Sequence, residues 1–239
     1  MSKRIRFLKI HFGLSVLIGG ILTLWFFFIG YSIPLAKALG AIQILLLVIV
    51  IDIIIGPILC FIIYRENKKS LKFDLSLIIF LQISAFTFGS YNLIQGRPAW
   101  IVYNQGNFDV VQRVELVTDE LSKATNEFKT IPILGPKFTA VKTRSFNEIN
   151  HEEKAKSISF IQQPEKYIKL NVEKENILKN SKPLDELNKY NDKKDIEKIK
   201  QQYPSAEAWL PLRSTTYNMV VLINKDPLQV VKVVDLNPW

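Results

Sequence analysis

Cysteine is nearly absent from this chain of 239 residues, since Cys60 is the only one. A single cysteine excludes an internal disulfide and any metal site built from cysteine pairs. Histidine is almost as scarce, because only His11 and His151 occur. His151 precedes two glutamates and has no second histidine or cysteine nearby, which is typical of an exposed residue rather than a ligand. We therefore expect no metal site.

The sequence also lacks the short motifs of common catalytic and nucleotide-binding sites. It contains no G-x-S-x-G pattern and no glycine-rich phosphate loop. Neighbouring serine and lysine residues, such as Ser122 and Lys123, are expected by chance in a chain so rich in lysine. We therefore predict that the protein is not an enzyme and binds no cofactor.

Acidic residues are few in the first part of the chain. Residues 1–95 contain nine basic and three acidic residues, whereas residues 96–239 contain 22 basic and 19 acidic ones. Most of the net charge of +9 therefore lies in short segments beside apolar runs. A nucleic-acid-binding domain gathers its basic residues on one folded face, whereas this distribution is typical of membrane topology. We expect no nucleic-acid partner.

Long apolar runs are the most abundant feature. Residues 12–31 and 75–94 carry no charge, and residues 38–64 carry only Asp52. A transmembrane helix needs about 20 mostly apolar residues, so residues 1–95 are predicted to form a membrane domain of three transmembrane helices. The first run exceeds the apolar core of a secretory signal peptide, which is about 7–15 residues long. We expect it to remain as an uncleaved anchor in the lipid bilayer.

The short basic segments predict the orientation of these helices. Residues 1–11 and residues 65–74 each contain four lysines or arginines, while residues 32–37 contain one. Basic residues concentrate on the cytoplasmic side of membrane proteins. The N-terminus is therefore expected in the cytoplasm, and everything after the third run in the periplasm of a bacterium. This predicts a multi-pass protein of the inner membrane.

Residues 96–239 have the composition of a single periplasmic domain. Alternating apolar residues around the turn at residues 104–107 predict a hairpin or a bulged strand. Residues 118–129 and 147–162 favour helices, and residues 173–203 favour a solvated helical excursion in which Pro183 starts a helix. The end of the chain predicts two strands joined at residues 225–227. The predicted fold class is α+β, with a small, mainly antiparallel sheet.

One acid lies in the middle of a predicted membrane helix. An ionised Asp52 there costs roughly 2.5–3.5 kcal/mol on insertion scales, and Gly56 with Pro57, four and five residues on, should weaken or kink the same helix. Packing of the three helices and recognition of a partner both remain open as its role. A proton relay is a third interpretation, although the predicted membrane runs offer no second ionisable group.

The residues that directly follow the third run have the composition expected where a chain leaves a membrane. Arg97 and Trp100 are expected to anchor the chain at the lipid headgroups, while Pro98 stiffens the exit. The following residues are expected to start the sheet and so to couple the membrane helices to the outer domain.

Five stretches together resemble the bacterial type IV pilin accessory proteins. They are DIIIGP at residues 52–57, GRPAWIVYNQGNFDVV at 96–111, EFKTIPILGPKFTAVK at 127–142, WLPLR at 209–213 and DLNPW at 235–239. The resemblance covers nearly the whole chain in the same order, and it departs from the family pattern mainly in residues 173–203. It adds Tyr103 and Trp209 to the structural or partner-binding candidates.

The resemblance implies an inner-membrane assembly factor without an active site. Its partners would be one cognate type IV pilin subunit and other pilus assembly proteins, and it would stabilise that pilin and modulate pilus assembly. The residues alone leave two alternatives open. These are a small transporter or proton-coupled subunit that uses Asp52, and a membrane-anchored periplasmic sensor.

Overall fold

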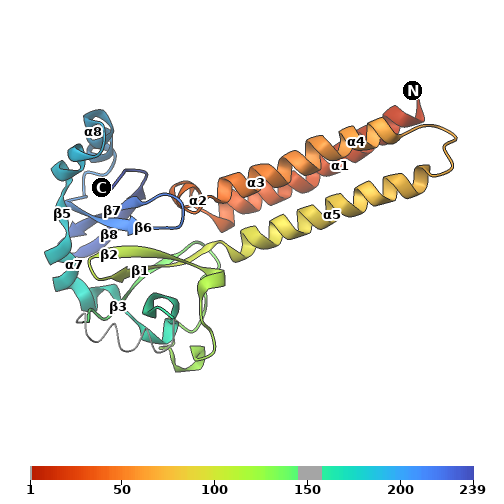
Figure 1. The fold of residues 1–239 in the computed structure, drawn as a ribbon. Coiled ribbons are helices and arrows are strands. Elements are labelled where there is room, and N and C mark those ends of the chain that lie inside the picture. The colour runs from red at the N-terminus through yellow and green to blue at the C-terminus, as the bar shows by residue number, and fades with distance from the viewer. Residues whose placement is uncertain (1, 145–157) are drawn as a thin grey trace. The chain divides into compact units, whose positions relative to one another are not determined.

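The computed structural model describes residues 2–144 and 158–239 (Figure 1). The chain forms two compact units. The helical unit runs to Tyr31 and continues with Ala41–Gly96, and the sheet unit combines Ser32–Gly40 with Arg97–Trp239. The short connection between the first two membrane runs therefore belongs to the sheet unit.

The helical unit consists of three long apolar helices. The first is α1 (Lys3–Trp25), which continues as a π-helical turn (Phe26–Gly30). The second contains α3 (Ala41–Ile49), a π-helical segment (Val50–Ile55) and α4 (Gly56–Ile63). The third is α5 (Leu71–Gln95). In the described part of the chain, three helical segments are long and apolar enough to cross a membrane, and their bounds are Lys3–Gly30, Ala41–Ile63 and Leu71–Gln95.

The sheet unit is built on one mixed sheet. Its described strands lie in the order β4-β3-β1-β2-β6-β7-β8, and β5 pairs with β6 at one side. Their bounds are β1 (Pro98–Asn104), β2 (Asn107–Gln112), β3 (Lys137–Val141), β4 (Tyr167–Ile168), β5 (Lys182–Pro183), β6 (Ala208–Arg213), β7 (Met219–Lys225) and β8 (Leu228–Val234).

The prediction of a small, mainly antiparallel sheet is wrong, because the sheet is mixed and has parallel pairs at its centre. The β1–β2 hairpin is antiparallel, but β3 pairs with β1 in parallel and β6 pairs with β2 in parallel. Both parallel partners arrive by long connections, so their strand direction is set by non-local packing. Local alternation and turn residues specify hairpins but carry no information on such pairs.

Several local predictions are confirmed and others are wrong. Gln105 and Gly106 have positive φ angles and make the predicted turn between β1 and β2. The turn at residues 225–227 joins β7 to β8, but the C-terminal region has three strands, because β6 precedes them.

Residues 118–129 do not form the predicted helix and contain only a 3₁₀ turn at Leu121–Lys123. Ala124 and Phe128 from this segment are buried in a core cluster, so packing overrides a weak helical propensity. The helix predicted at residues 147–162 lies mostly outside the described residues, and its described end holds only a 3₁₀ turn (Phe160–Gln162).

The predicted helical excursion contains α7 (Lys174–Asn180), a 3₁₀ segment (Leu184–Lys189) and α8 (Lys193–Gln202). Its apolar stripe is buried, because Leu187 and Ile196 join a core with strands β6 and β7. Pro183 does not start an α-helix but lies in β5, directly before the 3₁₀ segment.

Candidate functional site

The motif around Asp52 forms a polar junction between two membrane helices. In the π-helical segment, the amide of Gly56 donates to the carbonyl of Ile51, five residues back. The same spacing would pair Pro57 with the carbonyl of Asp52, but proline has no amide hydrogen. The side chain of Gln82 in α5 supplies the missing donor, with Nε2 lying 3.2 Å from the Asp52 carbonyl oxygen.

Asp52, Gly56 and Gln82 each contribute differently to this junction. Gln82 Nε2 also lies 3.5 Å from Oδ1 of Asp52, so one amide contacts both the backbone and the carboxyl group. A Cβ atom on Gly56 would overlap the Gln82 side chain, so glycine gives that amide its space. Asp52 and Gln82 are both buried. The Asp-x-x-x-Gly-Pro spacing thus builds a hydrogen-bonded contact inside the helical unit.

A third polar residue joins the junction from α1. The side chain of His11 interacts electrostatically with Asp52. Its Nδ1 and the Oε1 of Gln82 are buried without a hydrogen-bond partner among the described residues. The expectation that the membrane runs offer Asp52 no second ionisable group is therefore wrong. His11 lies just before the first apolar run of the sequence, but α1 extends that run back to Lys3.

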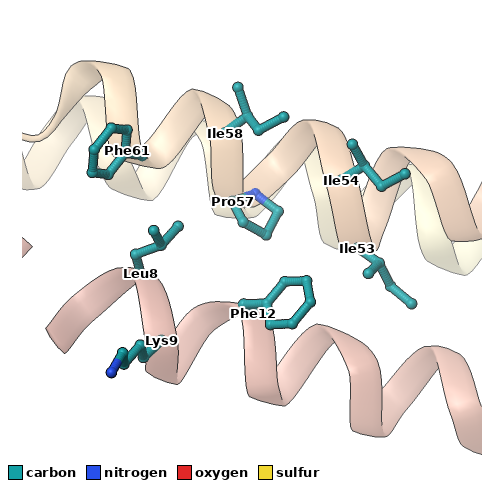
Figure 2. Close-up of a pocket in the computed structure, with 8 residues that line it drawn as sticks. All are labelled: Leu8, Lys9, Phe12, Ile53, Ile54, Pro57, Ile58 and Phe61. Atoms are coloured by element: carbon teal, nitrogen blue, oxygen red, sulfur yellow. The ribbon is translucent and has the colours of Figure 1, made fainter. Parts of the chain in front are cut away.

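An apolar groove lies between α1 and α4, next to the junction (Figure 2). Its volume is about 350 Å³. The lining residues are Leu8, Lys9 and Phe12 from α1, and Ile53, Ile54, Pro57, Ile58 and Phe61 from the second helix. Pro57 connects the two features, because its ring lines the groove while its missing amide hydrogen exposes the Asp52 carbonyl to Gln82.

The candidates at the membrane exit have a different role from the predicted one. Arg97 is only 5% exposed and Trp100 only 1% exposed, so the expected headgroup anchors are wrong. The Trp100 ring packs edge-on against Phe128 and Tyr167 in the core of the sheet unit. Pro98 opens β1, where it is buried. Position next to an apolar run indicated an interfacial tryptophan, but β1 lies between β2 and β3 and is buried from Pro98 to Tyr103, so Trp100 belongs to the core.

The remaining candidates are also core residues of the sheet unit. Tyr103 is fully buried, and its hydroxyl accepts a hydrogen bond of 3.2 Å from the Asn180 side chain. Burial raises the pKa of this phenol, which keeps it neutral at ordinary pH. Trp209 is fully buried too, and its indole nitrogen donates to the carbonyl of Pro183 at 3.0 Å. These two residues belong to the sheet unit, whereas the Asp52 junction belongs to the helical unit.

The connection between the first two membrane helices is a structural part of the sheet unit. It forms a short helix, α2 (Ile33–Ala38), with buried residues Leu35, Ala36 and Ala38. The carbonyl of Ala38 accepts hydrogen bonds from the Ser214 hydroxyl and from the amides of Thr216 and Tyr217. The sequence carries no clear signal of this docking, because a six-residue helix with one charge resembles an ordinary loop.

Lys37 adds an ion pair to this attachment, with Nζ lying 2.5 Å from Oδ2 of Asp235. Asp235 opens the terminal DLNPW stretch. In the residues that the structure describes, no group of three or more histidine, cysteine or acidic side chains could hold a metal ion.

Comparison with known proteins gives the family of the chain. A fimbrial assembly protein of serogroup I from Dichelobacter nodosus is 36% identical over 180 residues, which cover 73% of this chain and 70% of the relative. This chain belongs to the fimbrial assembly protein family. The family resemblance found in the sequence is thereby confirmed.

Two further fimbrial assembly proteins agree with this assignment. The serogroup E1 protein of the same organism is 34% identical over 180 residues, covering 73% of this chain and 70% of the relative. The protein of serogroups C1 and C2 is 36% identical over 117 residues, covering 48% of this chain and 89% of the relative. No family model matches the chain. No solved structure matches it either.

Proposed function

We propose that this fimbrial assembly protein is a non-enzymatic accessory factor of the bacterial inner membrane that binds one type IV pilin and modulates its assembly into pili. Its N-terminus would lie in the cytoplasm and its sheet unit in the periplasm. Other pilus assembly proteins are further partners in this proposal. The names of the relatives support a role in pilus assembly.

The observation that carries pilin binding is the groove between α1 and α4 (Figure 2). A pilin held in the membrane before assembly presents an apolar helix, and its large side chains would fill this groove. Ile54 and Ile58 on the groove are about half exposed in the isolated chain, at 50% and 52%. Helices in lipid associate through such close van der Waals packing rather than through a hydrophobic driving force.

Site-specific photocrosslinking in native membranes tests the proposal. A photoreactive residue at Ile58, on the groove, should give a covalent adduct with pilin. The same residue at Leu81 is the matched control, because Leu81 is 58% exposed on α5 and does not line the groove. Adducts of equal yield from both positions, or pilin adducts from Leu81 alone, would contradict groove binding.

A second candidate function rests on the polar junction. Asp52 and His11 provide two ionisable groups that interact electrostatically inside the helical unit, and such pairs occur in proton-coupled membrane proteins. In this alternative the protein would be a proton-coupled subunit. Asp52→Asn and His11→Asn would then each abolish piliation while leaving pilin crosslinking from Ile58 intact. Loss of both readouts, or of neither, would argue against proton coupling.

A further inference from the structure

Three exposed apolar side chains lie on two segments that are hydrogen-bonded to Arg97, the residue at which the chain enters the sheet unit. Val114 is 63% exposed, Ile133 is 68% exposed and Leu134 is 79% exposed. Such a group of large apolar side chains on a folded surface marks an interaction site. Its position along the chain identifies the interaction.

Arg97 holds both segments that carry these side chains. Its guanidinium Nη1 donates to the carbonyl of Ile133 at 2.9 Å. The backbone carbonyl of Arg97 accepts a hydrogen bond from the amide of Arg113 at 3.0 Å. Arg113 is the first residue of the 3₁₀ turn that contains Val114, so Arg97 holds this turn as well. Arg97 is buried, which fixes this arrangement within the sheet unit.

Chain connectivity keeps Arg97 close to the end of the third apolar helix. The third apolar helix, α5, ends at Gln95, and Arg97 follows two residues later, so their Cα atoms lie within about 8 Å of each other. The headgroup region on each side of a bilayer is about 5–7 Å thick. The two segments that Arg97 contacts are therefore tethered to the end of α5 through one short stretch of chain.

The exposure of the Ile133–Leu134 tip is built into its segment. Pro132 is buried and Ile131 packs against the core cluster of Trp100. On the other side, Gly135 has a φ of +68°, a conformation that favours glycine. The flanking residues are thus fixed, while the side chains of Ile133 and Leu134 remain exposed.

We propose that Val114, Ile133 and Leu134 form a membrane-seating patch, which inserts into the lipid headgroup boundary beside the end of α5. The patch takes the anchoring role that the sequence had indicated for Arg97 and Trp100. Apolar side chains at this depth bind a membrane surface by burying area in the boundary between headgroups and acyl chains. The patch binds lipid in this proposal, and the experiment below distinguishes lipid from a protein partner.

Depth-dependent fluorescence quenching on the full-length chain in lipid nanodiscs tests the patch. Cys60 is the only cysteine, so Cys60→Ala gives a background for a single introduced cysteine that carries an environment-sensitive dye. The test positions are Ile133→Cys and Leu134→Cys. Val172→Cys is the matched control, because Val172 is apolar, lies in the same unit and is also 68% exposed.

Lipids with a spin label near the headgroup should quench the dye at residues 133 and 134 severalfold more than at residue 172. Aqueous iodide should show the opposite order. Iodide quenching as strong at 133 and 134 as at 172, without quenching by labelled lipids, would overturn the proposal. Protection from iodide that appears only when pilin is added would overturn it too, because the patch would then be a protein-binding surface.

Discussion

The guanidinium of Arg213 forms a bidentate ion pair with the carboxylate of Asp109. Nε donates to Oδ1 at 2.7 Å and Nη2 donates to Oδ2 at 2.8 Å. The two residues are register partners on the parallel strands β2 and β6, which join the two halves of the sheet through only two registered pairs. The hydrogen bonds to Asp109 raise the pKa of Arg213 further above its ordinary range.

Replacing Arg213 by lysine should destabilise the sheet unit by about 1–2 kcal/mol, since lysine cannot form the two-pronged contact. The estimate is kept low because the Arg213 side chain is 46% exposed and solvent screens the pair. Thermal unfolding of the purified protein, followed by tryptophan fluorescence, measures the loss. Lys198→Gln is the control, because Lys198 pairs with Asp195 at 3.7 Å on the surface of α8. Equal losses from both variants would contradict a special role for the strand-joining pair.

Glu173 should make the sheet unit less stable in acid. Burial alone would raise the pKa of its carboxyl group, but hydrogen bonds from the hydroxyl and amide of Thr143 and from Asn176 outweigh burial and lower it. A carboxyl group with a lowered pKa in the folded state stabilises the fold above its unfolded pKa. That stabilisation is lost as the pH falls through the lowered folded value.

The melting temperature of the wild type should therefore exceed that of Glu173→Gln at neutral pH. The difference should shrink as the pH drops below the ordinary glutamate value of 4.5. Thermal melts across this pH range check the prediction. A difference that is constant with pH would show that the charge of Glu173 is not responsible.

Glycine at position 56 should be required for the polar junction. A methyl group there would displace the Gln82 side chain and break its hydrogen bond to the Asp52 carbonyl. Hydrogen bonds between membrane helices are worth about 0.6–2 kcal/mol, so Gly56→Ala should destabilise the helical unit by about that amount. Gly20→Ala is the control, since nothing lies within 4 Å of a Cβ at Gly20. The free energy of unfolding of each variant is measured in mixed micelles. Equal values for Gly56→Ala and Gly20→Ala would contradict this prediction.

Trp100→Ala should act through folding of the sheet unit. The indole fills a core between Phe128 and Tyr167, and removing a buried tryptophan from such a core costs about 3–5 kcal/mol. The variant should stay in the membrane through its helices but lose protease resistance in residues 97–239. Trp100→Phe should retain most of that resistance. A fully resistant Trp100→Ala protein with reduced piliation would instead support direct coupling between the units.

A reporter fused after Trp239 should be active only if it is one that works in the periplasm. The reason is the charge asymmetry, since four basic residues lie in each of the segments 1–11 and 65–74 and one lies in 32–37. Paired alkaline phosphatase and green fluorescent protein fusions measure the side directly. Fluorescence from a cytoplasmic fusion, without phosphatase activity, would reverse the proposed orientation.

The sequence by itself determined the features that depend on nearest neighbours along the chain. Three long apolar runs specified three long helices, because few other structures satisfy a backbone in lipid. The Gln105–Gly106 turn specified the β1–β2 hairpin, because its residues tolerate positive φ angles. The DIIIGP stretch identified an irregular point in the second helix, since Pro57 removes a backbone donor.

Tertiary structure decided what depends on residues far apart in the sequence. Gln82 and His11 carry no local signal of their role, and only packing of the three helices brings them to Asp52. The parallel pairing of β6 with β2 joins residues about a hundred positions apart, as Arg213 and Asp109 do. Trp100 reads as an interfacial anchor from its place after α5, yet it belongs to the core, because its direction is fixed by the register of β1 between β2 and β3. Local patterns set the elements, whereas the partners of each side chain follow from contacts that no local pattern encodes.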